Sequence, residues 1–412
     1  YPCREDIWGA IFLNQTLQID TARTTIADVM KRSGYSTAIV GKWHLGFRTD
    51  EKMDWNKELA PGPLELGFDY YFGVPILNSH PPFVYVENHH VVGYDPNDPF
   101  VRGKRAETEE FDEKFGINSI GGATAAHRLY KDRAVATTLK DRAVQWIKEH
   151  KDSPFFLYYA TTNIHHPFTP AERFVGTSEA GPYGDSIHEL DWVVGEIMRT
   201  LDEEGLAGNT LLIFTSDNGG MLNHGGQRAW KAGHHINGKL LGFKFGAWEG
   251  GHRIPMIVRW PGIVAPQTQC DHYLMIEDFF PTILEMAGVD NYTTVQQRDG
   301  ISFMPLLTGK GKMKDRDIYW HYPNSWGPSG PGIGATCSIR SGEWKLVYYF
   351  GDGRRELFNI PADISEKHDM AREKPEVVKE LSRKLSNYLR SVDAQRPLLR
   401  ATRQPAPWPD EI

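Results

Sequence analysis

Cysteine is scarce in this 412-residue sequence: Cys3, Cys270 and Cys337 stand far apart, are odd in number and form no C-x-x-C pair. Thiols arranged in this way indicate neither a disulfide framework nor a zinc site. Long apolar runs are missing too, since none approaches the roughly 20 residues that cross a bilayer, and the mean hydropathy is −0.47. These absences argue against a disulfide-stapled module and a membrane span, and we expect a water-soluble chain.

A surplus of positive charge is also lacking. The formal net charge is −7 and the isoelectric point is near 6.2. Binding to a nucleic-acid backbone requires a clustered excess of lysine and arginine, so a nucleic-acid partner is not expected. An anionic substrate would have to be bound by local cations.

Helix and strand signals alternate along most of the chain. Three helices are predicted, each followed by a strand, over 24–33 and 36–40, over 133–150 and 155–160, and over 186–204 and 210–216. This alternation predicts an α/β fold with a largely parallel central sheet flanked by helices.

The pattern changes near Asp315. Two short strands over 336–340 and 344–349 are joined by a turn, and a helix follows from Pro375 to about Ser391. We therefore predict an α/β domain over 1–314, a smaller C-terminal α+β domain with an antiparallel sheet over 315–395, and a Pro- and Arg-rich tail over 396–412 that lies on the surface or is disordered.

Polar residues follow the apolar runs, where ligands collect in open sheets of this type. Lys42 and His44 of G-K-W-H-L-G stand two residues apart, and in an extended segment their side chains would project to the same side. Lys42 suits an oxyanion, and His44 suits proton transfer. At the next strand end His165 and His166 precede Pro167, whose fixed φ stiffens the loop. One of these imidazoles could protonate a leaving oxygen.

Asp217 and Asn218 follow the strand predicted over 210–216 and precede two glycines. Carboxylate and amide oxygens suit Ca²⁺ or Mg²⁺, and Lys244 in a glycine-rich segment is a further candidate anion contact. These motifs also have a plainer interpretation as turns. Asp-Asn-Gly-Gly is a common turn, and the segment around Lys42 could be a tight turn in which Trp43 is packed. Gathered at successive strand ends of one sheet, the motifs predict a site for a tetrahedral oxyanion and the hydrolysis of a phosphate or sulfate ester.

The same strings resemble the sulfatase family of the alkaline-phosphatase-like superfamily. They are G-K-W-H-L-G, an H-x-P loop, S-D-N-G-G, K-x-x-x-x-E-G-G before R-I-P, and R-S-G-E-W-K-L-V-Y-Y, in family order over nearly the whole chain. The resemblance implies metal ligands, sulfate-binding cations and proton-transfer groups. These are Asp217 and Asn218 for Ca²⁺, Lys42 and Lys244 for sulfate, His44 beside the nucleophile and His165 at the leaving group.

The nucleophile of that family is a formylglycine hydrate made from Cys or Ser in a C/S-x-P/A-S-R motif. We expect this motif and two aspartate ligands of calcium upstream of Tyr1-Pro2, which resembles the pair that follows the motif. Cys3 cannot substitute, because it follows the pair and lacks the Pro/Ala, Ser and Arg of the motif. The 412 residues alone are therefore expected to bind calcium weakly and to turn over essentially no ester.

Loops near the expected site predict a sulfated sugar or polysaccharide as substrate. His235, in a His-rich insertion over 224–235, and His321 are candidate sugar contacts, although packed surface loops are the plainer interpretation. The resemblance implies export to the periplasm, the lysosome or the exterior. A phosphoester or phosphonate hydrolase of the same superfamily, or a non-catalytic protein that binds sulfated glycans, remain the alternatives. A purely structural domain would leave the motif residues without a role.

Overall fold

A computed structural model describes residues 11, 16–50, 52–105, 119–223, 225–324 and 327–412. Contacts between residues divide them into two compact units, and each is described by itself. The larger unit comprises Ile11–Leu212 and Val258–Met313, and the C-terminal unit comprises Ile213–Ile257 and Lys314–Ile412. Contacts thus join 213–257 to the C-terminal residues, whereas the sequence suggested a linear division at 314 and 395. A hydrogen bond of 2.9 Å from Trp248 Nε1 to Glu356 Oε2 is one such contact.

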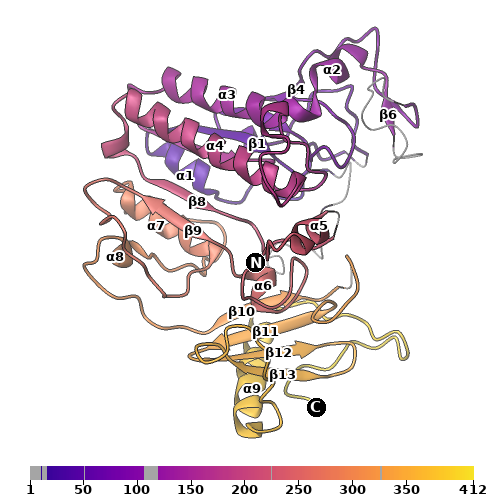
Figure 1. The fold of residues 1–412 in the computed structure, drawn as a ribbon, viewed down its shortest axis with the longest axis vertical. Coiled ribbons are helices and arrows are strands. Elements are labelled where there is room, and N and C mark those ends of the chain that lie inside the picture. Colours follow the sequence, from indigo (N-terminus) through magenta and orange to yellow (C-terminus); the bar gives the residue numbers. More distant parts are fainter. Residues whose placement is uncertain (1–10, 12–15, 51, 106–118, 224, 325–326) are drawn as a thin grey trace. The chain divides into compact units, whose positions relative to one another are not determined.

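The sheet of the larger unit has the strand order β4-β3-β2-β1-β7. Its strands are β1 (Ser36–Lys42), β2 (Tyr70–Val74), β3 (Val86–Glu87), β4 (His90–Val91) and β7 (Phe155–Ala160), as labelled in part in Figure 1. β1 pairs in parallel with β2 and β7, whereas β3 and β4 form an antiparallel hairpin. Gly41 lies opposite both Gly73 and Ala160, so the carboxyl ends of the three parallel strands meet at one edge.

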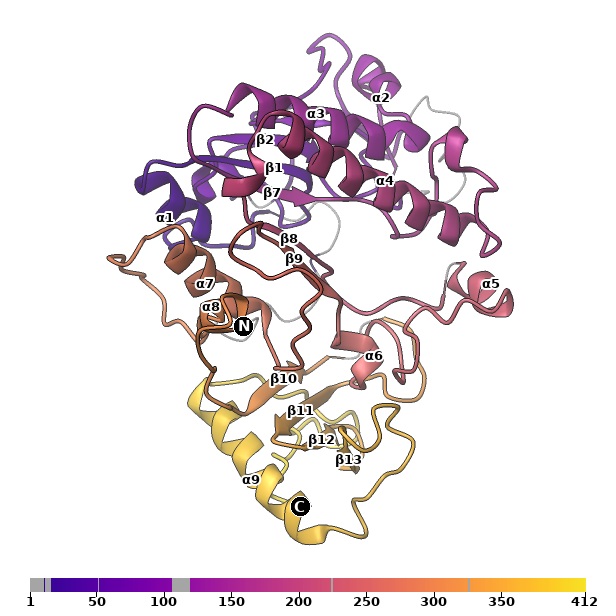
Figure 2. The ribbon, with the colours of Figure 1, turned by 60° about the vertical axis from the view of Figure 1, so that its left-hand side comes forward.

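Helices cover both faces of this sheet. The remaining elements of the larger unit are α1 (Ile26–Arg32), α2 (Thr124–Leu129), α3 (Val135–Glu149), α4 (Pro182–Glu203), α7 (Phe279–Met286), α8 (Met304–Leu307), β5 (Val101–Arg102) and β6 (Ile120–Gly121). Ile39 of β1 packs in a buried cluster with Ala27 of α1, and Val40 packs in another with Leu139 of α3. Neighbouring strand residues point to opposite faces, so α1 and α3 lie on opposite faces. α3 and α4 run side by side in Figures 1 and 2.

Local sequence explains where the first helix and strand begin. Thr25 caps α1, because its hydroxyl accepts the Asp28 N–H while the Asp28 carboxylate accepts the Thr25 N–H. Gly34 follows the helix with φ 89°, a conformation that favours glycine. β1 is buried along almost its whole length, as expected for a parallel strand covered on both faces.

The C-terminal unit contains an antiparallel sheet with the strand order β10-β11-β12-β13. Its strands are β10 (Ile318–Tyr322), β11 (Thr336–Ser341), β12 (Trp344–Tyr349) and β13 (Arg355–Asn359). The long helix α9 (Pro375–Ser391) lies along the sheet in Figure 2. Leu381, Leu385 and Leu389, spaced by one helical turn, pack in one cluster with Ile339 and Leu346 of the sheet. The predicted fold class, a mixed α/β fold with a mostly parallel central sheet and a C-terminal antiparallel sheet, is confirmed.

One predicted detail of the fold is wrong. β8 (Leu212–Thr215) pairs with β9 (Met256–Arg259) in a separate two-stranded sheet. The motif argument assumed that the strands preceding Lys42 and Asp217 belong to one sheet. They belong to two different sheets. The residues after 396 lie against the C-terminal unit, where Trp408 is 7% exposed and packs in the cluster beneath α9.

Two short helices, α5 (Gly226–Lys231) and α6 (Glu249–His252), complete the C-terminal unit. Among the helices of the described residues, none combines the length and the apolar character needed to span a bilayer.

Candidate functional site

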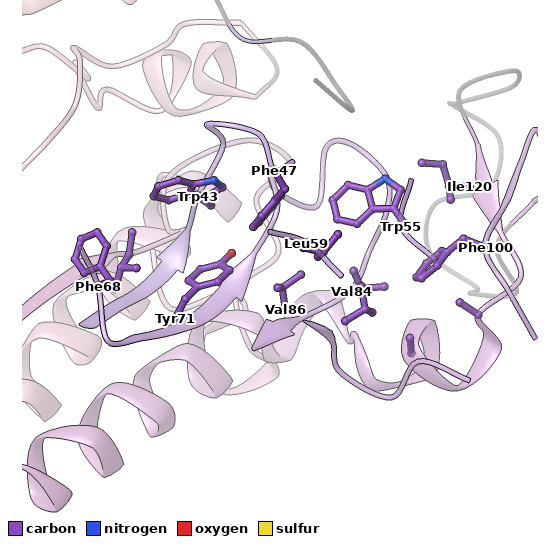
Figure 3. Close-up of a cluster of buried hydrophobic side chains, with 14 of the residues drawn as sticks. Trp43, Phe47, Trp55, Leu59, Phe68, Tyr71, Val84, Val86, Phe100 and Ile120 are labelled. Atoms are coloured by element: carbon purple, nitrogen blue, oxygen red, sulfur yellow. The ribbon is translucent and has the colours of Figure 1, made fainter. Parts of the chain in front are cut away.

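The loop after β1 carries Lys42 and is anchored by aromatic packing. Trp43 is 7% exposed, and its ring centroid lies 6.3 Å from those of both Phe47 and Tyr71. Figure 3 shows these three side chains in the same buried cluster. The indole Nε1 of Trp43 donates a hydrogen bond of 2.6 Å to the Gly46 carbonyl oxygen. Trp43 is thus a packing residue, and its packing fixes the backbone next to Lys42.

His44 lies beyond the end of β1. The strand ends at Lys42, and His44 adopts φ 56°, in the left-handed region. The side-chain alternation of an extended segment therefore does not relate Lys42 to His44, contrary to the prediction. The His44 backbone N–H donates to the Pro75 carbonyl at 2.9 Å, and its Nε2 donates to the Ile11 carbonyl at 3.0 Å. With Nε2 as donor, Nδ1 is the nitrogen that can accept a proton.

His165 lies in the loop that follows β7. Ile164 before it adopts φ 60°, which is rare for a β-branched residue. His165 Nδ1 donates to the His166 carbonyl oxygen at 2.6 Å, and the two rings stack with centroids 4.5 Å apart. Because a carbonyl oxygen only accepts, Nδ1 carries the proton of the neutral ring. Nε2 is therefore the nitrogen that takes up and delivers a further proton.

A buried carboxylate supports this loop on both sides of His165. Glu189 of α4 is 3% exposed. Its Oε2 accepts Asn163 Nδ2 at 3.0 Å, and its Oε1 accepts the Ala171 backbone N–H at 3.1 Å. Burial raises the pKa of Glu189, and these hydrogen bonds offset the effect in part. The sequence analysis missed Glu189, although it is a carboxylate on the buried face of an amphipathic helix.

His80 is a second residue that the sequence analysis missed. It lies in the loop after β2, where its Nδ1 is 2.9 Å from Ser79 Oγ. Burial lowers the pKa of His80, and the nearby charge of Lys42 lowers it further. Asn78 in the same loop donates through Nδ2 to the Pro167 carbonyl at 3.1 Å. The signal in the sequence was a third polar loop at the carboxyl end of a strand, Asn78-Ser79-His80.

The larger unit thus brings several predicted residues to one edge of its sheet. Lys42 ends β1, and the His165 loop follows the neighbouring strand β7. A cavity of about 30 Å³, room enough for a water molecule, is lined by Asn78, Asn163, His165 and Glu189 among others. Lys42, His165 and a polar cavity therefore lie at the same edge of the sheet.

The S-D-N-G-G motif forms a tight turn in the C-terminal unit. Asn218 Nδ2 donates to the Gly219 carbonyl at 2.9 Å, which leaves Oδ1 as the oxygen that can bind a cation. Asp217 beside it is exposed. The Gly219 N–H donates to the Gly251 carbonyl at 3.0 Å. A Cβ at Gly219 would lie 1.8 Å from the Gly250 carbonyl oxygen, so only glycine permits this approach.

Lys244 lies beside that turn. Its backbone N–H donates to the Gly220 carbonyl at 2.9 Å. Asn237 braces the same region, since its Oδ1 accepts the Gly220 N–H at 2.8 Å and its Nδ2 donates to the Gly242 carbonyl at 2.9 Å. The C-terminal unit thus holds the two predicted metal ligands and one of the two predicted sulfate-binding lysines, Lys244, on neighbouring, hydrogen-bonded segments.

The two predicted sugar contacts differ in their surroundings. His235 is exposed, and its ring meets the edge of Trp230 with centroids 4.2 Å apart. His321 instead packs in β10, where its Nε2 donates to the Gln395 carbonyl at 2.8 Å and its ring meets Phe350. Burial lowers the pKa of His321 to about 4. The His321 ring is thus held in place by this packing and by its hydrogen bond, and its role as a sugar contact stays a prediction.

The donors of the turn fit a hard divalent cation in kind. Asp217 and Asn218 offer a carboxylate and an oriented amide oxygen, and Ca²⁺ binds about six to eight oxygens, so the pair would supply two of them. Within the described part of the chain, no group of three or more His, Cys, Asp and Glu side chains could hold a metal ion. Further ligands would have to come from other oxygen donors.

Comparisons with known proteins identify the family of the chain. Two family descriptions match the chain: Sulfatase over residues 12–289, and N-sulphoglucosamine sulphohydrolase, C-terminal, over residues 244–395. An N-acetylgalactosamine-6-O-sulfatase of Bacteroides thetaiotaomicron is 36% identical over 94% of this chain and 81% of its own length. The N-acetylgalactosamine-6-sulfatase of Mus musculus is 31% identical over 89% and 70%, respectively.

Similarity extends to the three-dimensional structure. A solved structure concerned with the metabolism of multiple glycosaminoglycans by Bacteroides thetaiotaomicron has a TM-score of 0.82 and 33% identity, covering 95% of this chain and 86% of that one. The family match spans more than half of the chain and includes Lys42, His165, Asp217 and Lys244. The chain belongs to the sulfatase family.

Proposed function

We propose that the protein hydrolyses a sulfate monoester on a sugar, with N-acetylgalactosamine 6-sulfate as the first substrate to test. The observation that carries the proposal is the 36% identity, over 94% of the chain, to a sulfatase named for that sugar. The motif residues support it, because cations, imidazoles and hard oxygen donors are what a sulfate ester requires. Their roles in this reaction are inferred from their chemistry and from the family resemblance.

Cations would bind the transferred sulfate group. Lys42 and Lys244 neutralise its oxygens, and preorganised charge of this kind stabilises the transition state. Asp217 and Asn218 would hold part of the shell of a calcium ion, with magnesium as the less favoured metal. When bound, the ion supplies charge that polarises the ester. A formylglycine hydrate would supply the hydroxyl nucleophile.

Imidazoles would move the protons. His165 in its protonated form delivers a proton from Nε2 to the departing sugar oxygen, because an alkoxide is a poor leaving group. Its Nδ1 is held by the His166 carbonyl, which fixes the ring orientation during that transfer. His44, with Nε2 held by the Ile11 carbonyl, uses Nδ1 to exchange a proton beside the nucleophile. His235 is the proposed sugar contact.

The family's usual compartments, the periplasm, the lysosome or the exterior, are the proposed locations.

Sulfate release from N-acetylgalactosamine 6-sulfate by the protein expressed from its complete gene is the test of this proposal. We expect sulfate in stoichiometric amounts, a loss of about 10³-fold or more after chelation of calcium, and recovery when calcium is restored. The matching 6-phosphate should be a poor substrate. Faster hydrolysis of the phosphate, or activity that survives chelation, would point to the rival phosphoester hydrolase, and binding without turnover would point to a non-catalytic protein.

Glu189→Gln is expected to slow only substrates that need a protonated leaving group. An amide offers one acceptor oxygen where Glu189 uses two, so either the Asn163 or the Ala171 hydrogen bond is lost and the His165 loop shifts. We expect kcat for the sugar sulfate to fall about 10–100-fold. Hydrolysis of 4-nitrophenyl sulfate, whose leaving group needs no proton, should change little.

The matched control is Glu203→Gln, at an exposed position of the same helix, which should leave both substrates unaffected. An equal loss on the two substrates of the Glu189 variant would mean that Glu189 only stabilises the fold and does not position His165.

A further inference from the structure

His166 lies against the imidazole that the proposed function uses as an acid. Its ring stacks on that of His165, with centroids 4.5 Å apart and ring planes 23° from parallel. The His166 carbonyl oxygen also accepts the hydrogen bond from His165 Nδ1 at 2.6 Å. Both rings are partly exposed. His166 therefore touches His165 through its backbone and through its side chain.

The loop is held in place on either side of the two histidines. Before them, Asn163 Nδ2 donates to the Glu189 carboxylate of α4 at 3.0 Å. After them, the Pro167 carbonyl oxygen and the Thr169 hydroxyl oxygen both accept from Asn78 Nδ2, at 3.1 and 2.8 Å. Because the loop is fixed at both ends, the two rings stay close together when their charges change.

Two imidazoles at this distance do not titrate independently. Each ring becomes a positive charge when it is protonated. Two such charges 4.5 Å apart repel enough to separate the two protonation steps of the pair by about one to three pH units. A protonated ring beside a neutral one meets no such repulsion. The pair therefore carries a single proton over a broad pH range, and that proton is divided between the two rings.

Other charged groups lie around the pair. In the described part of the larger unit, the cavity beside His165 is lined by Asp132 and Glu189, and Lys42 ends the neighbouring strand. Arg133 Nη1 donates to a carbonyl oxygen of the same loop at 2.9 Å. Burial and the charge of Lys42 lower the pKa of His80, so that ring takes up its proton at lower pH. The fixed charges shift both protonation steps of the pair, and the repulsion between the rings sets the spacing of the steps.

We propose that His166 is a positioning residue that limits the pH range in which His165 delivers a proton. The proposal rests on the proposed function, in which protonated His165 protonates the departing sugar oxygen. When the single proton of the pair is on His166, His165 is neutral and cannot act as the acid. His165 is fully protonated only at the lower pH at which both rings are charged. Hydrolysis of the sugar sulfate should therefore change with pH over a wider range than one imidazole would give.

The test measures kcat for the sugar sulfate and for 4-nitrophenyl sulfate as a function of pH, with the protein expressed from its complete gene. Only the sugar needs a protonated leaving group, so protonation steps that both substrates share cancel in the ratio of the two kcat values. As the pH falls, the wild-type ratio should rise over about three to four pH units, whereas a single imidazole needs about two. His166→Phe keeps a stacked ring without its charge, and its ratio should rise within about two pH units.

His166→Arg tests the charge in the opposite direction. A guanidinium group stacks on rings and stays charged, so the ratio should reach half of its maximum about one to three pH units lower than in His166→Phe. The matched control is His150→Phe. The His150 ring also stacks on an aromatic neighbour, Trp146, at 4.2 Å, and its Nδ1 donates to the Trp146 carbonyl at 2.9 Å, but it follows the end of α3 that is remote from the cavity. This variant should reproduce the wild-type curve.

A wild-type ratio that rises within two pH units would overturn the proposal, as would identical curves for the phenylalanine and arginine variants. If the wild-type protein does not cleave the sugar sulfate, the proposed function has failed, and an NMR titration of the His165 ring still decides the role of His166. The Cε1–H signal of His165, assigned by its loss in His165→Gln, should shift in two steps in the wild type and in one step in His166→Phe. One step in both proteins would show that His166 only packs against His165.

Discussion

Replacing Lys345 by methionine is expected to lower the free energy of unfolding by about 3–5 kcal/mol, the usual effect of removing one partner of a buried ion pair. The Lys345 side chain is fully buried. Its Nζ lies 2.9 Å from Glu249 Oε1 and 2.9 Å from Glu366 Oε1. It also donates to His252 Nε2 at 3.2 Å. Methionine keeps the length of the side chain but leaves two buried carboxylates without their cation.

The titration of the neighbouring groups follows from this one charge. Burial raises the pKa of Glu249, but the charge of Lys345 outweighs it, so the net shift is downward. Burial also raises the pKa of Glu366, and Lys345 offsets this only in part. One ammonium group cannot fully compensate two carboxylates. Burial and the charge of Lys345 lower the pKa of His252 to about 4. The ring is therefore neutral, and its Nε2 accepts a hydrogen bond from the Lys345 ammonium group.

Denaturant unfolding of the wild-type and variant proteins measures the effect. The matched control is Lys384→Met: Lys384 also pairs with two carboxylates, Asp317 at 3.3 Å and Glu380 at 3.7 Å, but is partly exposed. Its replacement should cost about 0–1 kcal/mol. Adding Glu366→Gln to Lys345→Met should restore part of the lost stability, since one uncompensated charge is removed. Equal losses in the two lysine variants would contradict the argument.

The Lys345 network also reaches the predicted metal ligands. Glu249 begins α6, whose Gly251 carbonyl accepts the Gly219 N–H beside Asn218. The C-terminal hairpin that carries Lys345 is thereby connected to the S-D-N-G-G turn through a few hydrogen bonds. We infer that this hairpin contributes to the site by holding the turn.

The elements with strong local patterns could be predicted closely from the sequence. β7, β12 and α9 occupy the ranges predicted for them, because an apolar run bounded by turn residues or a regular helical repeat is visible in a few consecutive residues. α3 begins at Val135, two residues after the predicted start, because a short 3-10 turn precedes it. The motifs with Lys42, His165, Asp217 and Lys244 were found for the same reason: each is a short contiguous string.

Features that depend on distant pairing could not be predicted in this way. Lys345 and Glu249 stand 96 positions apart, and nothing in either local sequence indicates that they meet. β8 had the pattern of a buried strand, but the pattern does not say which strand it joins. His321 lies in a strand whose two faces look alike in sequence, since aromatic residues stand on both sides of it. At Glu189 the sequence shows only a charged residue at a helix position that is expected to be buried.

Lys244→Met is expected to reduce kcat/KM for the sulfated sugar by about 10²–10³-fold, the usual effect of removing one preorganised group from the transition state. Lys244 sits beside the S-D-N-G-G turn through its backbone hydrogen bond to Gly220, and methionine leaves that bond intact. The side chain forms no ion pair within the described part of its unit, so unfolding should be unchanged. Loss of activity without loss of stability is the signature of a group that contacts substrate.

Two comparisons make this result decisive. Lys239→Met, an exposed lysine five residues earlier in the same segment, should retain full activity, which separates a specific contact from the general positive potential. Lys244→Arg should recover part of the loss, because the charge is kept while its geometry changes. Inhibition by free sulfate should weaken in parallel with kcat/KM, because Lys244 would contact the oxygens of free sulfate in the same way as those of the transferred group. If Lys244→Met instead behaves like Lys239→Met, the contact of its Nζ with the Phe245 ring at 5.6 Å is its main role, and sulfate must be bound by other groups.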